Sequence, residues 1–271
     1  AGARLLDLGV EQTAHALAQC VSHASGVKAN FGSMVKPLHV GKALRCALFS
    51  LLSAERGFLA RLDAFEAPQG YLDVFNGEGN FDVDAIVNGW GQPFDILDSG
   101  LGLKQFPCCG STHAPINCAF AIREMPGFNI DEVASVTVMT HPLRIPHTNT
   151  PDPQTLVQAK FSTQYVVARA LLDGAVRMND FEQRRPWDDD VRRLMHQISF
   201  HAHPDMPMDG DNHFAGEVIV TLRSGETFSY RKDHEVGRGI PNPMSDDELW
   251  EKYSDCARRS VDDRAARQSF E

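Results

Sequence analysis

Two lysine–histidine segments contain the residues whose types and spacing could do chemistry. In the first, Lys36 and His39 flank Pro37, where a glycine-containing loop leads into an apolar stretch. Pro37 is typical of a first helical turn, and the unpaired N–H groups of such a turn attract anions. Lys36 and His39 are therefore candidates to hold a carboxylate or to transfer a proton. The alternative is that Lys36 is a solvated surface lysine and that His39 only packs or caps.

The second segment runs from Lys104 to His113 and leads into a helix predicted over residues 114 to 124. Ser111 and Thr112 supply hydroxyls and free N–H groups at the helix start, an arrangement that holds carboxylate oxygens. The functional interpretation gives Lys104 the role of a charge and His113 that of a hydrogen-bonding or proton-transfer group. In the alternative, Ser111 or Thr112 is only an N-cap and His113 packs beside it.

The cysteines and the remaining histidines do not form a recognisable site. Cys108 and Cys109 are adjacent, which makes them a poor disulfide pair, and neither has a base partner that would mark a thiol nucleophile. The six cysteines contain no CxxC pair, so we expect a reducing cytoplasm. We expect no metal from the following histidines, because no carboxylate or cysteine stands at a ligand spacing beside them: His196, His201, His203 and His213.

The amino-acid composition and net charge of the chain indicate which kinds of binding partner to expect. The chain has 271 residues, 42% hydrophobic and 23% charged, which suits a globular protein of two modest domains. Its net charge is −10 and its lysines and arginines are scattered, so nucleic acid is not the expected partner. No apolar run approaches the roughly 20 residues of a membrane span, and no signal peptide is recognisable. An acidic protein that binds anionic metabolites must concentrate its few cations in one cleft.

The pattern of elements changes along the chain. Residues 11 to 20 and 42 to about 55 have helical spacing, and a β-type pattern is expected after a boundary near Pro93. Beyond it we predict a strand over 132 to 140, helices over 159 to 172 and 188 to 195, and a hairpin over 216 to 231. A capping box from Ser245 to Glu248 opens the final helix.

Three motifs together resemble the MmgE/PrpD family, which includes 2-methylcitrate dehydratase, cis-aconitate decarboxylase and iminodisuccinate epimerase. They are residues 29 to 39 (ANFGSMVKPLH), 104 to 113 (KQFPCCGSTH), and 242 to 249 (NPMSDDEL) with the Asp-Cys-Ala at 255 to 257. The resemblance implies a mainly α fold with an α+β lid, in which the smaller α+β domain is inserted before the C-terminal helix of an all-helical domain. Residues 1–93 would be part of the helical domain, 94–235 the lid, and 236–271 the return.

The resemblance also implies an activity. We expect a carbon–oxygen lyase that dehydrates a small tricarboxylate such as 2-methylcitrate by acid–base catalysis without a cofactor. The alternatives are an epimerase or decarboxylase acting on iminodisuccinate or cis-aconitate, or a catalytically incomplete carboxylate-binding subunit. Family members are usually homodimers, so the resemblance also implies a homodimer. The family's N-terminal helical portion has no counterpart before Ala1, so we expect a fragment, with a separate chain as the candidate partner that supplies the missing part.

The family's functional residues carry over to named positions. Lys36 and Lys104 match its two active-site lysines, so catalysis is expected from Lys36, His39, Lys104 and His113. Cys109 stands where cis-aconitate decarboxylase has a histidine, and His147 lies near the position of a tyrosine implicated there. Substrate binding is therefore expected from Ser33, Cys109, Ser111, Thr112 and His147. We expect the two lysines to act on one acidic substrate.

Overall fold

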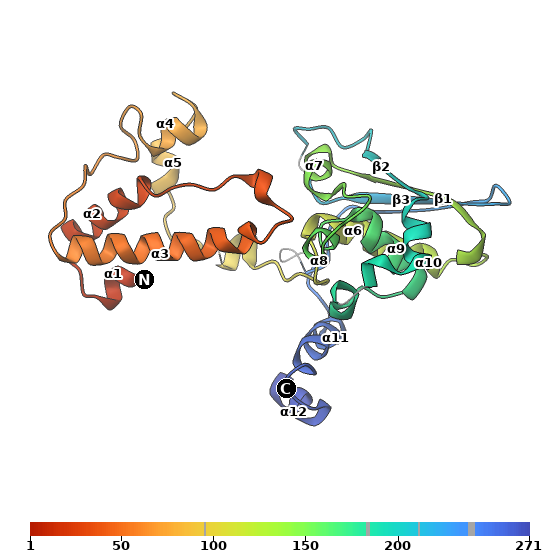
Figure 1. The fold of residues 1–271 in the computed structure, drawn as a ribbon. Coiled ribbons are helices and arrows are strands. Elements are labelled where there is room, and N and C mark those ends of the chain that lie inside the picture. Colours follow the sequence, from red (N-terminus) through yellow and green to blue (C-terminus); the bar gives the residue numbers. More distant parts are fainter. Residues whose placement is uncertain (95, 183–184, 211, 238–241) are drawn as a thin grey trace. The chain divides into compact units, whose positions relative to one another are not determined.

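The computed structural model describes residues 1–94, 96–182, 185–210, 212–237 and 242–271 (Figure 1). The chain divides into two compact units, Ala1–Phe94 and Asp95–Glu271. Among the described residues, no helix is long and apolar enough to cross a membrane.

The first unit is helical. Its long helix α3 (Val35–Glu55) packs against α2 (Val10–Val21), with Ser50 and Ala54 of α3 buried. Gln19 of α2 donates a hydrogen bond from Nε2 to the carbonyl oxygen of Phe58 over 2.9 Å, which holds the chain that follows α3 against α2. The shorter helices are α1 (Gly2–Leu5), α4 (Tyr71–Asn76) and α5 (Val83–Val87).

The start of α3 differs from the prediction for residues 42 to 55. The helix already begins at Val35, so Lys36 and Pro37 occupy its first turn and Gly41 lies within it. Proline is tolerated in a first turn, and an interior glycine costs only about 1 kcal/mol relative to alanine. Helix α3 therefore starts at the turn that Pro37 indicated and continues through Gly41, and it does not start at residue 42.

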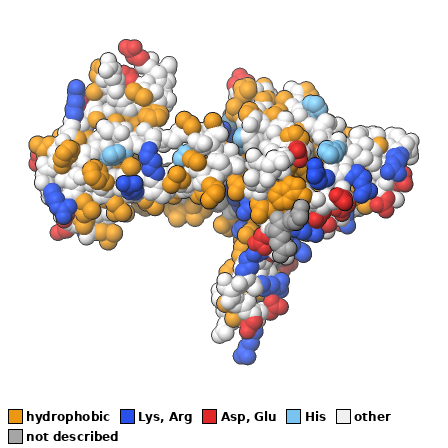
Figure 2. Space-filling view, viewed as in Figure 1, with side chains coloured by type: hydrophobic (Ala, Val, Ile, Leu, Met, Phe, Trp, Pro, Cys, Tyr) orange, Lys and Arg blue, Asp and Glu red, His pale blue; other side chains and the backbone are white. Residues whose placement is uncertain are grey.

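One face of α3 carries a row of exposed apolar side chains at four-residue spacing: Val40, Leu44, Leu48 and Leu52. Residues four apart share one helical face. On the side of the molecule drawn in Figure 2, apolar side chains are spread over the surface of this unit. Contiguous apolar surface of this kind is typical of an interaction surface.

The second unit is built on a mixed four-stranded sheet in the order β2-β1-β3-β4. Strand β1 (Val133–Thr140) pairs in parallel with β2 (Ile198–Ala202) and antiparallel with β3 (Gly216–Leu222), which forms a hairpin with β4 (Thr227–Lys232). The predicted strand and hairpin are confirmed. The β-type pattern expected directly after Pro93 is wrong, because residues 96–100 form a π-helical turn and the strands begin only at Val133.

Helices pack on this sheet to form the core. Helix α6 (His113–Arg123) lies against β3 and β4, and α9 (Thr163–Asp173) lies against α6 and α10 (Asp189–Met195) (Figure 1). Strand β3 buries every second residue, which places its apolar side chains under α6. The helices predicted over 114 to 124 and 188 to 195 are confirmed. The helix predicted over 159 to 172 begins only at Thr163, because Ser162 caps it by accepting a hydrogen bond from the backbone N–H of Tyr165 over 3.0 Å. Helix α9 ends where Gly174 takes the left-handed conformation.

A buried arginine joins α9 to the chain before α10. Arg169 is 1% exposed, and its guanidinium donates to Asp173 (3.0 Å), to Asp188 (2.6 Å) and to the carbonyl oxygen of Arg185 (2.6 Å). Burial opposes the charge of Arg169, but the hydrogen bonds that its guanidinium donates to Asp188 and Tyr165 outweigh this effect, so its pKa is raised. A buried charge with this many partners holds the two helices in one arrangement.

The C-terminal helices belong to the second unit. Helix α11 (Asp246–Ala257) begins with the predicted capping box: the backbone N–H of Glu248 donates to Ser245 Oγ (3.3 Å) and that of Ser245 to Glu248 Oε2 (2.8 Å). Asp255 accepts a hydrogen bond from the backbone of Met178 over 2.9 Å. The remaining helices are α7 (Ile145–Thr148), α8 (Leu156–Ala159) and α12 (Asp263–Phe270). The structure thus combines helices with a small mixed sheet, an α+β architecture, while the three-part division of the chain stays a prediction.

Candidate functional site

In the helical unit, Lys36 and His39 lie on the first turns of α3, and both are half-buried. The Lys36 ammonium is 4.6 Å from the centroid of the Phe31 ring, a cation–π distance. The imidazole of His39 lies over Gly26, whose missing Cβ would stand 3.4 Å from three ring atoms. The structure therefore places both residues at the helix start, as predicted, and the aromatic ring restrains the lysine.

Ser33 shapes the loop that precedes α3. Its hydroxyl donates to the carbonyl oxygen of Asn30 over 2.7 Å and accepts from the backbone N–H of Val35 over 3.2 Å. A serine that satisfies a backbone donor at a helix start acts as a cap. A role of Ser33 in substrate binding stays a prediction, and the hydroxyl already has two partners in its own loop.

In the second unit, the loop before α6 carries the predicted cation. Lys104 is exposed, and its Nζ donates to the carbonyl oxygen of Cys108 over 3.2 Å. The backbone N–H of Cys109 donates to the carbonyl oxygen of Lys160 over 2.8 Å, which ties the loop to the chain before α9. Lys104 can therefore present a positive charge to solvent while its loop is held in place.

Glu235 is a neighbour of this loop that the sequence did not reveal. It is 5% exposed, and its Oε1 lies 3.6 Å from the position where a Gly110 Cβ would stand, with Lys104 Cε 3.9 Å from the same point. The glycine lets both side chains approach the loop backbone. A glutamate in an irregular segment after a strand has no spacing that marks it, so only the tertiary structure places it here.

Ser111 and His147 come together across 36 residues of sequence. Ser111 Oγ lies 3.0 Å from His147 Nε2, a hydrogen bond between the turn before α6 and helix α7. Ser111 is 9% exposed and His147 is half-buried. The structure therefore joins two residues that the sequence assigned separately to substrate binding.

Thr112 and the adjacent cysteines lie inside the loop. The Thr112 hydroxyl donates to the carbonyl oxygen of Cys109 over 2.8 Å and contacts Cys108 Sγ at 3.3 Å. Both cysteines and Thr112 are buried. Burial raises the pKa of the Cys108 thiol to about 12, so it stays protonated and is a poor nucleophile. Buried side chains bonded within their own loop shape it, and a direct contact of Thr112 or Cys109 with substrate stays a prediction.

His113 is enclosed in the core beneath the loop. It is 2% exposed, and its ring packs edge-on against Phe106 at a centroid distance of 5.2 Å. Burial, and then the positive charge of Lys104, lower its pKa to about 3. His113 is therefore a neutral imidazole near pH 7, and its Nε2 has no hydrogen-bond partner among the described residues. This environment disfavours the proton-transfer role expected from the sequence.

Among the other histidines, His203 has a structural contact. Its Nδ1 accepts from the backbone N–H of Asp205 (3.0 Å), so Nε2 carries the hydrogen and donates to Glu217 (2.8 Å). Across the described ranges of the chain, no three His, Cys, Asp or Glu residues are grouped as metal ligands would be.

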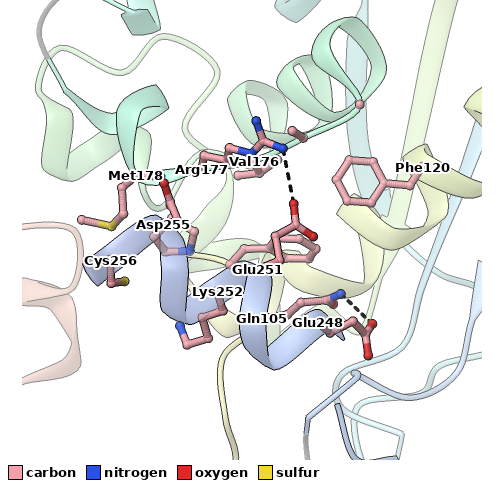
Figure 3. Close-up of a pocket in the computed structure, with 14 residues that line it drawn as sticks. Gln105, Phe120, Val176, Arg177, Met178, Glu248, Glu251, Lys252, Asp255 and Cys256 are labelled. Carbon is pink, nitrogen blue, oxygen red and sulfur yellow. Dashed lines mark hydrogen bonds and ion pairs between the residues drawn. The ribbon is translucent and has the colours of Figure 1, made fainter. Parts of the chain in front are cut away.

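A cavity of about 340 Å³ lies between α11 and the chain around residues 105–107 and 174–178 (Figure 3). At its edge, the Arg177 guanidinium pairs with Glu251 at 3.4 Å, and Gln105 Nε2 donates to Glu248 over 3.1 Å (Figure 3). None of the predicted site residues lines it. Gln105, Phe106 and Pro107 of its lining belong to the loop that carries Lys104 and Ser111, so the cavity borders that loop on another side.

A lysine and a hydrogen-bonded serine–histidine pair at the start of a buried helix form an arrangement suited to an anionic ligand. Residues 1–84 match the MmgE/PrpD N-terminal domain, and residues 106–271 match the MmgE/PrpD C-terminal domain. The chain belongs to the MmgE/PrpD family, as its motifs predicted.

Three curated relatives share the name cis-aconitate decarboxylase. The chain is 30% identical over 270 residues to the cis-aconitate decarboxylase of Mus musculus, covering 93% of this chain and 52% of that protein. It is 28% identical over 260 residues to the enzyme of the same name from Homo sapiens, with coverage of 93% and 52%. The Aspergillus terreus enzyme is 24% identical over 282 residues, with coverage of 96% and 56%. The chain thus spans about half the length of the curated relatives it matches.

Proposed function

We propose that this chain acts as a lyase on a small di- or tricarboxylate, with its own side chains as acids, bases and cations. The observation that carries the proposal is the loop before α6, where exposed Lys104 and the Ser111–His147 hydrogen bond lie in a chain of the MmgE/PrpD family. The relatives named as cis-aconitate decarboxylases support a tricarboxylate substrate.

The chemistry explains why lysines are needed. Dehydration of 2-methylcitrate, the reaction expected from the sequence, and decarboxylation of cis-aconitate, the reaction in the relatives' names, both build negative charge beside a carboxylate. A fixed ammonium stabilises that charge more in the transition state than in the ground state. We assign this role to Lys104 and, on α3, to Lys36. Epimerisation of iminodisuccinate would need the same cations and proton transfers.

The test is turnover followed by NMR. The purified chain is incubated separately with 2-methylcitrate, cis-aconitate and iminodisuccinate, and the product formed identifies the reaction. Lys104→Ala and Lys36→Ala should each lower kcat/KM at least about 100-fold, the loss typical when one group that stabilises developing charge is removed. Lys232→Ala, a half-buried lysine at the end of β4, is the matched control and should retain activity.

Two results would contradict the proposal. Unchanged kinetics in Lys104→Ala would remove the main assignment in the second unit. Saturable carboxylate binding without any turnover would instead support the carboxylate-binding subunit that the sequence left open.

We also propose that the chain works as a homodimer, as the family resemblance implied. The exposed apolar row of α3, from Val40 to Leu52, is the kind of surface that a second copy would cover. Light scattering on the purified chain measures the mass. A monomer at all concentrations would contradict this proposal, and a dimer unaffected by Leu44→Gln with Leu48→Gln would place the interface elsewhere.

A further inference from the structure

Two histidines of the second unit flank the loop that carries Lys104, and their surroundings are opposite. His113 is 2% exposed, packs against Phe106, and stays neutral because burial lowers its pKa to about 3. His147 is half-buried and holds a hydrogen bond to Ser111 over 3.0 Å. An imidazole enclosed in the core cannot readily exchange protons with a ligand, whereas a half-buried one that is bonded to a hydroxyl can pass a proton through that hydroxyl.

The fold fixes the geometry of the Ser111–His147 pair. Ser111 lies in the turn Gly110–Thr112 directly before α6, and that helix is anchored in the core by buried residues such as Ile116 and Ile122. His147 lies on α7, which contacts β2 and buries the next residue, Thr148. Both partners therefore stand on backbone that is held from inside the unit, as proton transfer requires.

We infer that His147, acting through Ser111, is the proton donor that this unit supplies to the reaction, in the place that the sequence gave to His113. The inference rests on the proposed function and specifies one part of it. Serine is suited to the intermediate position because its hydroxyl both accepts and donates a hydrogen bond. Imidazole is suited to the outer position because its ordinary pKa lies near neutrality.

The imidazolium hydrogen on Nε2 of His147 passes to Ser111 Oγ, while the hydrogen of the Ser111 hydroxyl passes to the substrate. In a dehydration it reaches the oxygen of the leaving hydroxyl, which departs as water with the electrons of its C–O bond. In a decarboxylation it reaches the carbon that keeps the electrons of the broken C–C bond as CO₂ leaves. His147 ends as neutral imidazole, Ser111 is unchanged, and solvent restores the proton.

The experiment compares four variants on whichever substrate the wild-type chain turns over. His147→Gln and Ser111→Ala should lower kcat by a factor of about 10² to 10⁴, the usual contribution of a positioned acid, with KM changed by less than about threefold. His147→Ala should recover activity when imidazole is added, a rescue that a structural role would not give. His201→Gln, an exposed histidine of β2, is the matched control and should behave as wild type.

A second measurement does not depend on turnover. In ¹⁵N NMR of histidine-labelled protein, binding of cis-aconitate should shift the ring nitrogens of His147, and Ser111→Ala should remove that shift. The rings of His113 and His201 should not respond.

Three results would overturn the inference. They are retained kcat in His147→Gln, a rise in KM with kcat unchanged, and saturable binding of cis-aconitate with no response at His147. If the wild-type chain neither binds nor converts any of the three carboxylates, the proposed function fails and this inference fails with it. Activity in wild type together with an unaffected His147→Gln overturns the inference alone.

Discussion

Replacing His113 by leucine should remove a pH-dependent loss of stability. The pKa of His113 is lowered from 6.5 to about 3, first by burial and then by Lys104. A group whose folded pKa is depressed contributes stability above its unfolded pKa and loses it as pH falls. Between pH 6.5 and pH 5, His113 is therefore protonated in the unfolded chain but remains neutral in the folded chain.

The size of this loss of stability follows from the pH range over which only the unfolded chain is protonated at His113. Each pH unit below 6.5 costs about 1.4 kcal/mol from this group, so the wild-type free energy of unfolding should fall by about 2 kcal/mol between pH 6.5 and 5 on account of His113. Carboxylates contribute little in this range, because their ordinary pKa values lie near 4. Leucine suits the site because the His113 ring is packed against Phe106 and its Nε2 has no partner in the described chain.

The assay is urea unfolding of wild type and His113→Leu at pH 7, 6 and 5, with His201→Gln as the exposed control. The leucine variant should lose the extra slope below pH 6.5, and the control should keep it. A His113→Leu variant with the wild-type pH dependence would show that the imidazole accepts a proton in the folded state. That result would restore His113 as a candidate for proton transfer.

The remaining predictions concern Arg169, Glu235 and the cap of α11. Arg169→Met should lower the free energy of unfolding by about 2 to 3 kcal/mol. This is less than the roughly 3 to 5 kcal/mol lost when a fully buried ion pair is broken, because the side chains of Asp173 and Asp188 are 36% exposed and can be rehydrated. Arg192→Met, whose ion pair is exposed, should cost under about 0.5 kcal/mol by the same urea assay, and equal losses would contradict the reasoning. Glu235→Gln should tighten cis-aconitate binding a few-fold in calorimetry, because it removes a buried negative charge beside Lys104; weaker binding would mean that Glu235 holds the loop instead. Ser245→Ala should destabilise the start of α11 by about 1 kcal/mol, seen as faster hydrogen exchange there, and unchanged exchange would show that packing alone holds that end.

Local signals predicted many of the elements well. The alternation of Val133 to Thr140, the capping box at Ser245 and the glycine that ends α9 each determine a short stretch by their own chemistry. At α3 the apolar pattern placed the start at residue 42, whereas Pro37 indicated the first turn that the structure shows. After Pro93, turn residues were taken for a strand pattern.

For the candidate site, too, the sequence indicated some features and left others undecided. The motifs around Lys36 and Lys104 indicated a carboxylate-binding family from the sequence, and the family match confirms that membership. Residue type also drew attention to His113, Ser111 and His147. It could not say which imidazole is enclosed in the core and which is half-buried beside a hydroxyl, because burial depends on what the rest of the chain packs around each one.

The sequence by itself therefore determined the family and the helices and strands with strong local patterns, and it indicated Lys36 and Lys104 as candidate cations. Only the tertiary structure decided that Ser111 meets His147, that His113 is kept neutral in the core, and that Glu235 lies beside Gly110. The physical reason is the separation in sequence over which each interaction acts. Caps and periodicity act between residues a few positions apart, whereas hydrogen-bond pairing and desolvation are set by neighbours that folding brings from distant parts of the chain.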